Sequence, residues 1–433
     1  MTWALILFSA AVVGYWQPLG LVVTLALTAF TWLLIRLAQG ASAPRRRVIV
    51  SSGVSVLVLT LIAFGYVPWF LALLRGTSTP ETWVVPLGLS FTVFRLIGAV
   101  FDSVALRLPA SPRQLLLLAL FFPTYRAGPI ETLSSLTPLP QGGADGRGTR
   151  WALERIVLGV CRKVILADPL QAYVIGPWLA GGVDALSGPQ CLLMPFLFGL
   201  RLYWDFSGYS DIAIGTAALL GYRVRENFDR PYLSTNLVEF WSRWHITLSE
   251  WIRIRLFMKL AGRRAPKWRF HFATVVSMAI CGLWHGAGTN FLVWGLWHGV
   301  GLVVVHLFRD GVQKRPVLLH VTSTESARLV SIALTYVYVS IGWLAFFLPL
   351  DRALRIASGA IRWSPGEGLA APGVLVAGVI VLVAAPVILL LDPRRSGVPA
   401  TARAAVMSIA GGVALYLLLL HRTALQDFIY AQF

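Results

Sequence analysis

Residues Gly282 to Gly299 read GLWHGAGTNFLVWGLWHG, which places His285 and His298 in strongly apolar sequence. At about 100° per residue, the thirteen positions between them would put the two side chains well apart around a continuous helix. The run GAGTN (286–290) favours a break between two helices. The stretch contains no Asp or Glu, so we expect no metal site here. Packing, proton chemistry and a pore lining are the alternatives for these histidines.

The composition is that of a polytopic membrane protein. The chain has 433 residues, of which 57% are hydrophobic and 13% charged, whereas a soluble protein carries about 25% charged residues. Its mean hydropathy is +0.71, and its apolar runs are long enough to span a bilayer. We therefore predict an all-α membrane protein with a single membrane domain (1–433) and roughly ten to twelve hydrophobic passes.

The formal net charge of +18 has two interpretations, nucleic-acid binding and cytoplasmic loops. Lys and Arg collect in the cytoplasmic loops of inner-membrane proteins and meet anionic lipid there, so we favour the membrane interpretation and expect no nucleic acid. Cys161, Cys191 and Cys281 lack paired spacing and predict neither a disulfide framework nor a metal site. The N-terminus has no basic region before its apolar run, so no cleavable signal peptide is expected.

The apolar segments are separated by turns and by a basic region. A Gln-Pro-Leu-Gly turn follows the first segment, the third is interrupted near Gly65 and Pro68, and a Gly- and Pro-rich loop covers 137–150. Residues 125–130 (YRAGPI) predict a re-entrant turn near a tunnel, because unmatched backbone groups at membrane depth must be buried in protein. The expected segments are 2–16, 21–37, 48–74, 83–100, 115–122, 156–166, 191–203, 212–220, 272–283, 291–307, 329–348, 372–391 and 406–420.

Residues 221–270 carry eleven Lys or Arg against four acids, with several tryptophans among them. This composition is typical of headgroup level. The cations between the two apolar blocks predict a cytoplasmic face that helps to hold an anionic donor, although each could equally be part of a solvated positive-inside loop. They are Arg253, Arg255, Arg263, Arg264 and Lys267.

Ionisable groups at membrane depth are costly and usually functional. The stretch YWDFSGYSD (203–211) contains Asp205 and Asp211, and it predicts a helix–loop–helix junction capped by Asp205 or Ser207. Further along, Asn236 and Glu239 predict a capping box. The helix that it opens would carry Trp241, Arg243, Trp244 and His245.

Three histidines, His245, His285 and His298, each follow a tryptophan. A single such histidine is most often a packed core residue, but three favour chemistry. Neutral imidazole can take a proton from an alcohol and return it to a leaving group near neutral pH. The sequence has no Gly-x-Ser-x-Gly elbow and no obvious nucleophilic cysteine, so direct transfer is simpler than a covalent intermediate.

Together these segments resemble the membrane-bound O-acyltransferase family, in particular its bacterial branch of alginate O-acetylation and D-alanyl-transfer proteins. The resemblance runs from about residue 86 to 298, and it implies a ring of tilted and re-entrant helices around a tunnel. The motifs that carry it are PLGLSFTVF (86–94), YRAGPIE (125–131), RKVILAD (162–168), DFSGYSDIAIG (205–215), ENFDRPY (226–232), FWSRWHITLSEW (240–251) and GLWHG (282–286).

The family pattern implies that His285 is the catalytic histidine, that His245 is its partner, and that His298 belongs to a second Trp-His-Gly motif. Two departures stand out. Ile254 replaces the acid of the usual Arg-Asp-Tyr, and GYWQP (14–18) lacks the helix that normally precedes it. The further candidates are Asp205, Ser207, Tyr209 and Arg243 as additional site residues, and Arg253, Arg255, Trp244 and Trp284 for donor binding.

The resemblance implies transfer of an acyl group, acetyl above all, from a cytoplasmic thioester such as acetyl-CoA to a hydroxyl. The acceptor would be a secreted or cell-surface polysaccharide or an extracytoplasmic acyltransferase partner. The enzyme would lie in the bacterial inner membrane with no tightly bound cofactor. The alternative is a transporter or flippase of a lipid-linked glycan that uses the histidines as proton relays. The missing internal repeat counts against that alternative.

Overall fold

The computed structural model is helical almost throughout, which confirms the prediction of an all-α protein. The described chain forms two compact units, residues 1–149 with 216–225 and residues 150–215 with 226–432. The single membrane domain stays a prediction. The structure describes residues 2–75, 85–139, 148–264, 266–315, 324–363, 378–380, 392, 394 and 399–420.

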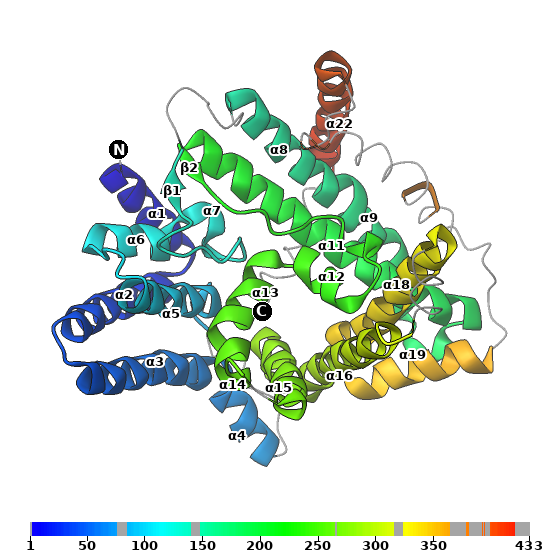
Figure 1. Cartoon of the computed structure of the whole chain (residues 1–433). Coiled ribbons are helices and arrows are strands. Elements are labelled where there is room, and N and C mark those ends of the chain that lie inside the picture. The colour runs from blue at the N-terminus through cyan, green and yellow to red at the C-terminus, as the bar shows by residue number, and fades with distance from the viewer. Residues whose placement is uncertain are drawn as a thin grey trace. The chain divides into compact units, whose positions relative to one another are not determined.

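The first unit consists of helices and one small sheet (Figure 1). The two strands pair antiparallel, with Thr137 opposite Arg223. A buried apolar cluster around Ile35, Val100 and Leu118 joins α2, α5 and α6. The elements are α1 (Thr2–Trp16), α2 (Pro18–Gln39), α3 (Ala43–Gly65), α4 (Val67–Arg75), α5 (Leu89–Ala105), α6 (Pro112–Leu120), α7 (Phe122–Tyr125), β1 (Thr137–Pro138) and β2 (Tyr222–Arg223).

The predicted breaks in this unit occur where proline and glycine place them. Helix α2 begins at Pro18, a position where the missing N–H costs nothing. The long segment 48–74 is divided between α3 and α4 after Gly65, as expected. Beyond Tyr125 the chain turns, and residues 127–130 are buried in a non-helical conformation. The turn at 125–130 is therefore confirmed, and its position near a tunnel stays a prediction.

The second unit is built from the following helices, two of which extend past its boundary. They are α8 (Thr149–Cys161), η1 (Arg162–Ala167), α9 (Asp168–Leu170), η2 (Gln171–Ile175), α10 (Gly176–Ala180), η3 (Val183–Ala185), α11 (Gly188–Leu219), η4 (Pro231–Leu233), α12 (Leu237–Arg243), α13 (Ile246–Ile252), η5 (Arg253–Phe257), α14 (Met258–Ala261), α15 (Lys267–His285), α16 (Thr289–Val312), α18 (Glu325–Phe347), α19 (Leu350–Arg362) and α22 (Ala400–Leu420).

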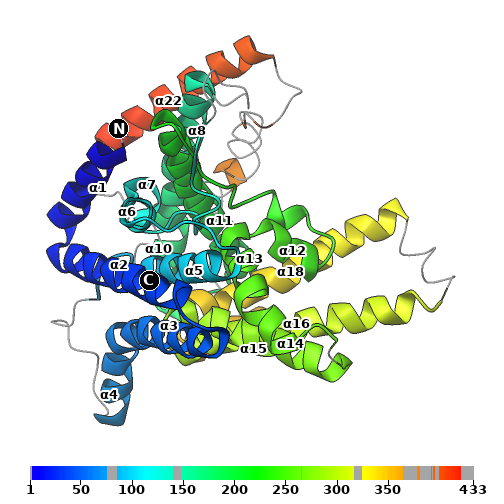
Figure 2. The same ribbon diagram turned by 60° about the vertical axis from the view of Figure 1, so that its left-hand side comes forward.

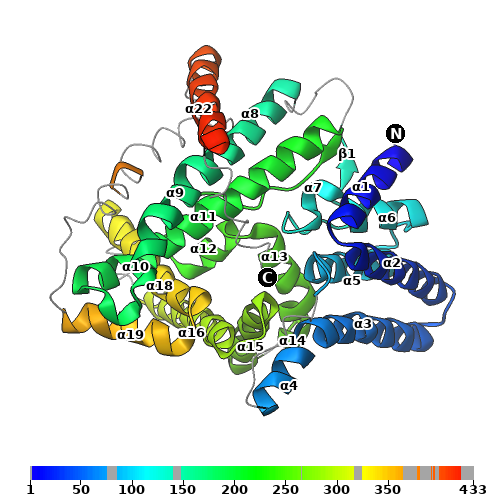
Figure 3. The ribbon, with the colours of Figure 1, turned by 180° about the vertical axis from the view of Figure 1, so that it is seen from behind.

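Helix α11 is continuous through the segment for which a junction was predicted, so that prediction is wrong. It runs alongside α8 (Figures 1 and 3), and the two backbones meet at Gly159 and Gly208. A Cβ atom added at Gly159 would lie 2.4 Å from the carbonyl oxygen of Gly208. The helices can approach this closely because both positions lack a side chain. The polar side chains of α11 therefore face partners on neighbouring helices instead of breaking the helix.

Within the described residues, four helices are long and apolar enough to cross a membrane, namely α2, α3, α16 and α18. The total of ten to twelve passes stays a prediction, and the expected segment 372–391 lies outside the described residues except for 378–380. Helix α15 ends at His285 and α16 begins at Thr289, which confirms the break at 286–290. Helix α19, whose sequence alternates apolar and basic residues, was not predicted.

Candidate active site

His245 lies between two short helices of the second unit. Helix α12 ends at Arg243, Trp244 caps it, and His245 precedes α13. The backbone of His245 has φ 42° and ψ 53°, in the left-handed region that residues other than glycine seldom adopt. Residues whose backbone lies in this region cluster at functional sites. The side chain of His245 is only 1% exposed. The prediction that one helix carries Arg243, Trp244 and His245 is wrong.

The helix ends at Arg243 because the loop at 226–229 pairs with the chain there. Phe228 forms an isolated β-bridge with Trp244. The amide of Asp229 donates to the Arg243 carbonyl over 2.9 Å, and the amide of Ile246 donates to the Asn227 carbonyl over 3.0 Å. These bonds replace the bonds that would continue α12, and they hold His245 at a fixed point.

Asn227 fixes the imidazole of His245. Its Oδ1 accepts from the amide of Thr247 (3.3 Å) and from the Thr247 hydroxyl (2.9 Å), so this atom acts as an acceptor. His245 Nδ1 lies 3.1 Å from the same oxygen and must therefore be the protonated nitrogen. This tautomer places the basic lone pair on Nε2. A hydrogen bond to one ring nitrogen thus determines which nitrogen can accept a proton.

His285 is the last residue of α15 and is 3% exposed. Its ring contacts Trp284, Trp294 and Phe346, with centroid distances of 4.8, 5.2 and 4.9 Å. The C-terminal end of a helix carries partial negative charge and stabilises a cation placed there. The helix end therefore offers partial negative charge to the imidazolium that forms when His285 takes a proton, whereas burial among the surrounding rings disfavours that charge.

Trp284 lies between the two histidines. The centroid of its ring is 6.0 Å from that of His245 and 4.8 Å from that of His285. The structure therefore brings His245 and His285 together within one side chain of each other.

His298, on α16, is fully buried. It contacts Trp294 at 5.0 Å and Trp241 at 5.2 Å, and Trp294 also contacts His285. Within the part of the chain that the structure describes, neither ring nitrogen of His298 has a hydrogen-bond partner. One ring therefore separates His298 from His285, just as one ring separates His245 from it. We expect His298 to lie further from the reaction centre than His245 does.

The glycines of the opening motif bring α15 and α16 into contact. A Cβ atom added at Gly282 would lie 2.2 Å from the carbonyl oxygen of Phe291, and one at Gly295 would lie 2.3 Å from that of Met278. No side chain fits at either position, and small residues are what permits close packing of helices in a membrane. The close packing of the hairpin holds Trp294 against His285.

The segment at 203–211 borders this site through apolar and neutral residues. Phe206 contacts the His245 ring at 4.8 Å, and Ser210 lies 3.4 Å from the Asn227 amide nitrogen. Ser207 is buried on α11, and Tyr209 is half-buried. In this segment, the contacts with His245 and Asn227 given above come from Phe206 and Ser210, which were not predicted as site residues.

The two aspartates of α11 belong to buried ion pairs. Asp205 accepts from Lys163 Nζ at 2.7 Å, and Lys163 also pairs with Asp168 at 2.8 Å. Asp211 pairs with Arg155 at 2.5 Å and with Arg162. Buried charges require such partners, because desolvation of an isolated charge is costly. The contacts of Asp205 therefore indicate a structural role.

The proposed donor-binding residues have different surroundings. Trp244 is buried against Phe240 and Trp343, whereas Trp284 is half-buried beside the histidines. Arg253 is exposed and Arg255 is half-buried, both on the π-helical turn η5. Of these candidates, Trp284 is the one that contacts the histidines directly.

Arg243 pairs with Glu239 at 2.6 Å, close to the start of α12. Asn236 caps this helix by accepting from the Glu239 amide at 3.0 Å, as predicted, but the Glu239 carboxylate accepts from the amide and hydroxyl of Thr235. Burial alone would raise the pKa of Glu239. The hydrogen bonds from Thr235 and the charge of Arg243 outweigh burial and hold that pKa below its ordinary value. Arg243 therefore supports the helix that leads to His245.

Asn227 and Thr247 were missed as site residues, although ENFDRPY and WHIT contain them. An asparagine eighteen positions from a histidine carries no local signal of contact. Among the described residues there is no group of three His, Cys, Asp or Glu side chains that could hold a metal ion. The three cysteines are free and buried.

Two buried imidazoles, one with its tautomer fixed by an amide and one at a helix end, define a site for proton transfer inside an apolar helical unit. The model of the MBOAT family, the membrane-bound O-acyltransferases, matches residues 58–347. The chain belongs to this family and is a multi-pass membrane protein. This membership favours acyl transfer over the transporter alternative.

Three relatives illustrate the range of the family. A probable alginate O-acetylase of Azotobacter vinelandii is 32% identical over 378 residues, which are 81% of this chain and 71% of that protein. A peptidoglycan O-acetyltransferase of Helicobacter pylori is 28% identical over 56% of this chain and 45% of its own length. A teichoic acid D-alanyltransferase of Streptococcus thermophilus is 30% identical over 50% of this chain and 56% of its own length. The chain thus spans about half the length of the last two.

Proposed function

We propose that the protein transfers a short acyl group, acetyl in the first place, from a cytoplasmic thioester to a hydroxyl of a cell-surface polysaccharide. The observation that carries the proposal is the pair of buried imidazoles of His245 and His285, which both contact Trp284, within the residues that the family model matches. The names of the alginate and peptidoglycan relatives support acetyl as the acyl group and polysaccharide as the acceptor. The location is the bacterial inner membrane.

In the proposed reaction His285 acts as the general base. Its neutral imidazole takes the proton of the acceptor hydroxyl, and the oxygen forms a bond to the thioester carbonyl carbon. The carbonyl electron pair moves to oxygen, then returns as the carbon–sulfur bond breaks. The thiolate leaves with that bonding pair and receives the proton from the imidazolium. His245, held by Asn227, positions the reactants and contributes its Nε2 lone pair.

The exclusion of water around His285 supports transfer over hydrolysis, because a wet site would send the acyl group to water. The basic residues near α14 and α15, among them Arg253, Arg255 and Arg264, would attract an anionic donor such as acetyl-CoA to one side of the membrane. The acceptor would reach the histidines from the other side through a tunnel. An extracytoplasmic acyltransferase could take the acyl group in place of the polysaccharide.

The proposal is tested with purified protein reconstituted in vesicles and supplied with acetyl-CoA and a polysaccharide that offers the acceptor hydroxyl. We expect release of free coenzyme A thiol, measured with a thiol-reactive dye, and we expect His285→Ala to abolish most of it. His306→Ala is the matched control, because His306 lies on α16 with its Nδ1 at 2.7 Å from the Leu302 carbonyl. Movement of a lipid-linked sugar across the vesicle without thioester cleavage would contradict acyl transfer.

A further inference from the structure

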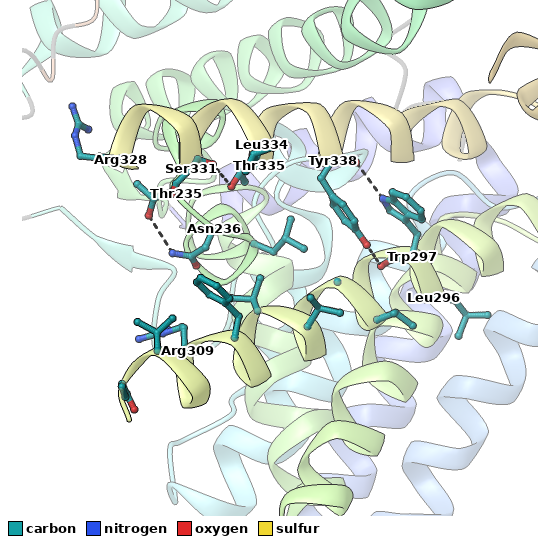
Figure 4. A pocket seen from close by; sticks show the side chains of 18 of the residues that line it. Thr235, Asn236, Leu296, Trp297, Arg309, Arg328, Ser331, Leu334, Thr335 and Tyr338 are labelled. Carbon is teal, nitrogen blue, oxygen red and sulfur yellow. Dashed lines mark hydrogen bonds between the residues drawn. The ribbon is translucent and has the colours of Figure 1, made fainter. Parts of the chain in front are cut away.

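A large groove lies between α16 and α18, and neither His245 nor His285 is among the residues that line it. The two helices diverge toward the ends that carry Val312 and Glu325 (Figure 2). The space between them has a volume of about 1250 Å³ (Figure 4). Both helices are long and apolar enough to cross a membrane. The groove therefore follows the direction of the lipid chains.

Most of the groove wall is apolar and open. Val300, Val304, Phe308 and Leu334 line it, and each of these side chains is more than half exposed. Apolar side chains in this position on membrane-spanning helices meet hydrocarbon instead of water. An acyl chain is the ligand that matches this wall.

The narrow end of the groove is closed by Trp297 and Tyr338 (Figure 4). The Trp297 Nε1–H donates to the Tyr338 carbonyl over 3.2 Å, and the Tyr338 hydroxyl donates to the Trp297 carbonyl over 2.6 Å. The two rings stack with centroids 4.4 Å apart. This reciprocal pair limits how far a chain can enter between the helices.

The part of the groove between Arg328 and Tyr338 matches the depth of one leaflet. Ten residues of α18 separate Tyr338 from Arg328 at the wide end, and they span about 15 Å at the usual helical rise. Half of the hydrocarbon core of a bilayer is also about 15 Å. A lipid whose chain ends at Tyr338 would therefore have its headgroup at the level of Arg328.

The wide end of the groove is cationic. Arg309 and Arg328 line it from the two helices, together with Thr235 and Asn236 (Figure 4). Arg328 forms an exposed ion pair with Glu325 at 2.7 Å, whereas Arg309 is exposed and has no ion pair with any residue that the structure describes. The wide end therefore has an unneutralised positive charge on Arg309 beside the amide group of Asn236, whereas the Thr235 hydroxyl already donates to Glu239.

We propose that this groove binds one anionic phospholipid of the cytoplasmic leaflet. The acyl chain lies against α16 and α18 as far as Trp297 and Tyr338, and the phosphate lies between Arg309 and Arg328. Lys267 at the start of α15 pairs with Asp310 near the end of α16, so the basic loop before α15 lies on the same side. Such basic surfaces attract the anionic lipids of the cytoplasmic leaflet.

The test uses the full chain, freed of lipid in detergent and titrated with phosphatidylglycerol or phosphatidylcholine of identical chains. Native mass spectrometry counts the bound lipids. We expect one phosphatidylglycerol to bind more tightly than phosphatidylcholine. Arg309→Gln should lower the affinity for phosphatidylglycerol about fivefold, which is the effect of one basic residue at a membrane surface. The affinity for phosphatidylcholine should not change. Arg315→Gln is the control, because Arg315 is exposed just after α16 but does not line the groove.

A second pair of variants tests the acyl-chain wall. Val304→Trp should fill the groove and weaken the binding of both lipids. Val330→Trp should leave the binding of both unchanged, because Val330 is exposed on α18 but does not line the groove. Equal binding of the two lipids by the unmodified chain would overturn the proposal. So would equal effects of Arg309→Gln and Arg315→Gln, or a lipid-free dimer whose formation Val304→Trp prevents.

Discussion

The Nδ1–H of His245 donates to Asn227 Oδ1 over 3.1 Å, and the same oxygen accepts two bonds from Thr247. This relationship fixes both the tautomer and the orientation of an imidazole whose backbone is already in the left-handed region. Asn227 is therefore a positioning residue for His245, and its removal should affect turnover more than substrate binding.

Asn227→Ala should lower kcat about fivefold with little change in KM, because one lost hydrogen bond of about 1 kcal/mol frees the His245 ring. Acyl transfer at saturating and limiting donor separates the two parameters. Asn236→Ala is the matched control. It removes the cap of α12 and should lower the free energy of unfolding by about 1 kcal/mol while kcat stays unchanged. A KM effect without a kcat effect for Asn227→Ala would contradict the positioning role.

Gly295→Ala should destabilise the protein by more than about 2 kcal/mol, because the added Cβ would lie 2.3 Å from the Met278 carbonyl oxygen. Gly311→Ala, on the same helix, has nothing within 4 Å of the added atom. It should stabilise α16 slightly, since alanine is the better helix former by about 1 kcal/mol. Thermal unfolding in detergent measures both, and equal changes in Tm would refute the close packing of α15 on α16.

Asp211→Asn should destabilise the protein by about 3–5 kcal/mol, because Arg155 and Arg162 would lose their shared buried partner. Asp351→Asn breaks the exposed pair with Arg355 and should cost less than about 1 kcal/mol. Unfolding of both variants in the same detergent tests the difference. If Asp211→Asn unfolds like the unmodified protein, the buried charges are not coupled as the structure indicates.

Arg264→Cys should react with a membrane-impermeant maleimide only when the cytoplasmic side is accessible, as in inverted vesicles. The residue is exposed in the basic loop before α15. The three native cysteines are buried, so they should react little with the maleimide. Labelling from the opposite side in right-side-out vesicles would reverse the orientation of the proposed donor entrance.

Much of the helical framework could be predicted, because it depends on local features. Pro18, Gly65 and the run at 286–290 end or begin helices for reasons that lie within a few residues. The same is true of the Asn236 cap. The pairing of His285 with His245 followed from the family pattern, which brings together residues forty positions apart.

What could not be predicted depends on distant partners. Asp205 and Asp211 look like breaks in an apolar segment until Lys163, Arg155 and Arg162 are placed opposite them, and then α11 can remain continuous. In the same way, the loop that carries Asn227 pulls Trp244 and His245 out of α12. Neither effect has a signature in the local sequence.

The assignment of His285 as the general base is tested most directly by measuring acyl transfer by three variants, His285→Ala, His245→Ala and His298→Ala. Each variant is first checked for membrane insertion and an unchanged Tm. General base catalysis contributes about 10²- to 10⁴-fold, so His285→Ala should lose at least 10²-fold in kcat. His245→Ala should lose activity through positioning, and His298→Ala should lose least. Full activity in His285→Ala, with the loss confined to His298→Ala, would contradict the assignment of His285 as the base.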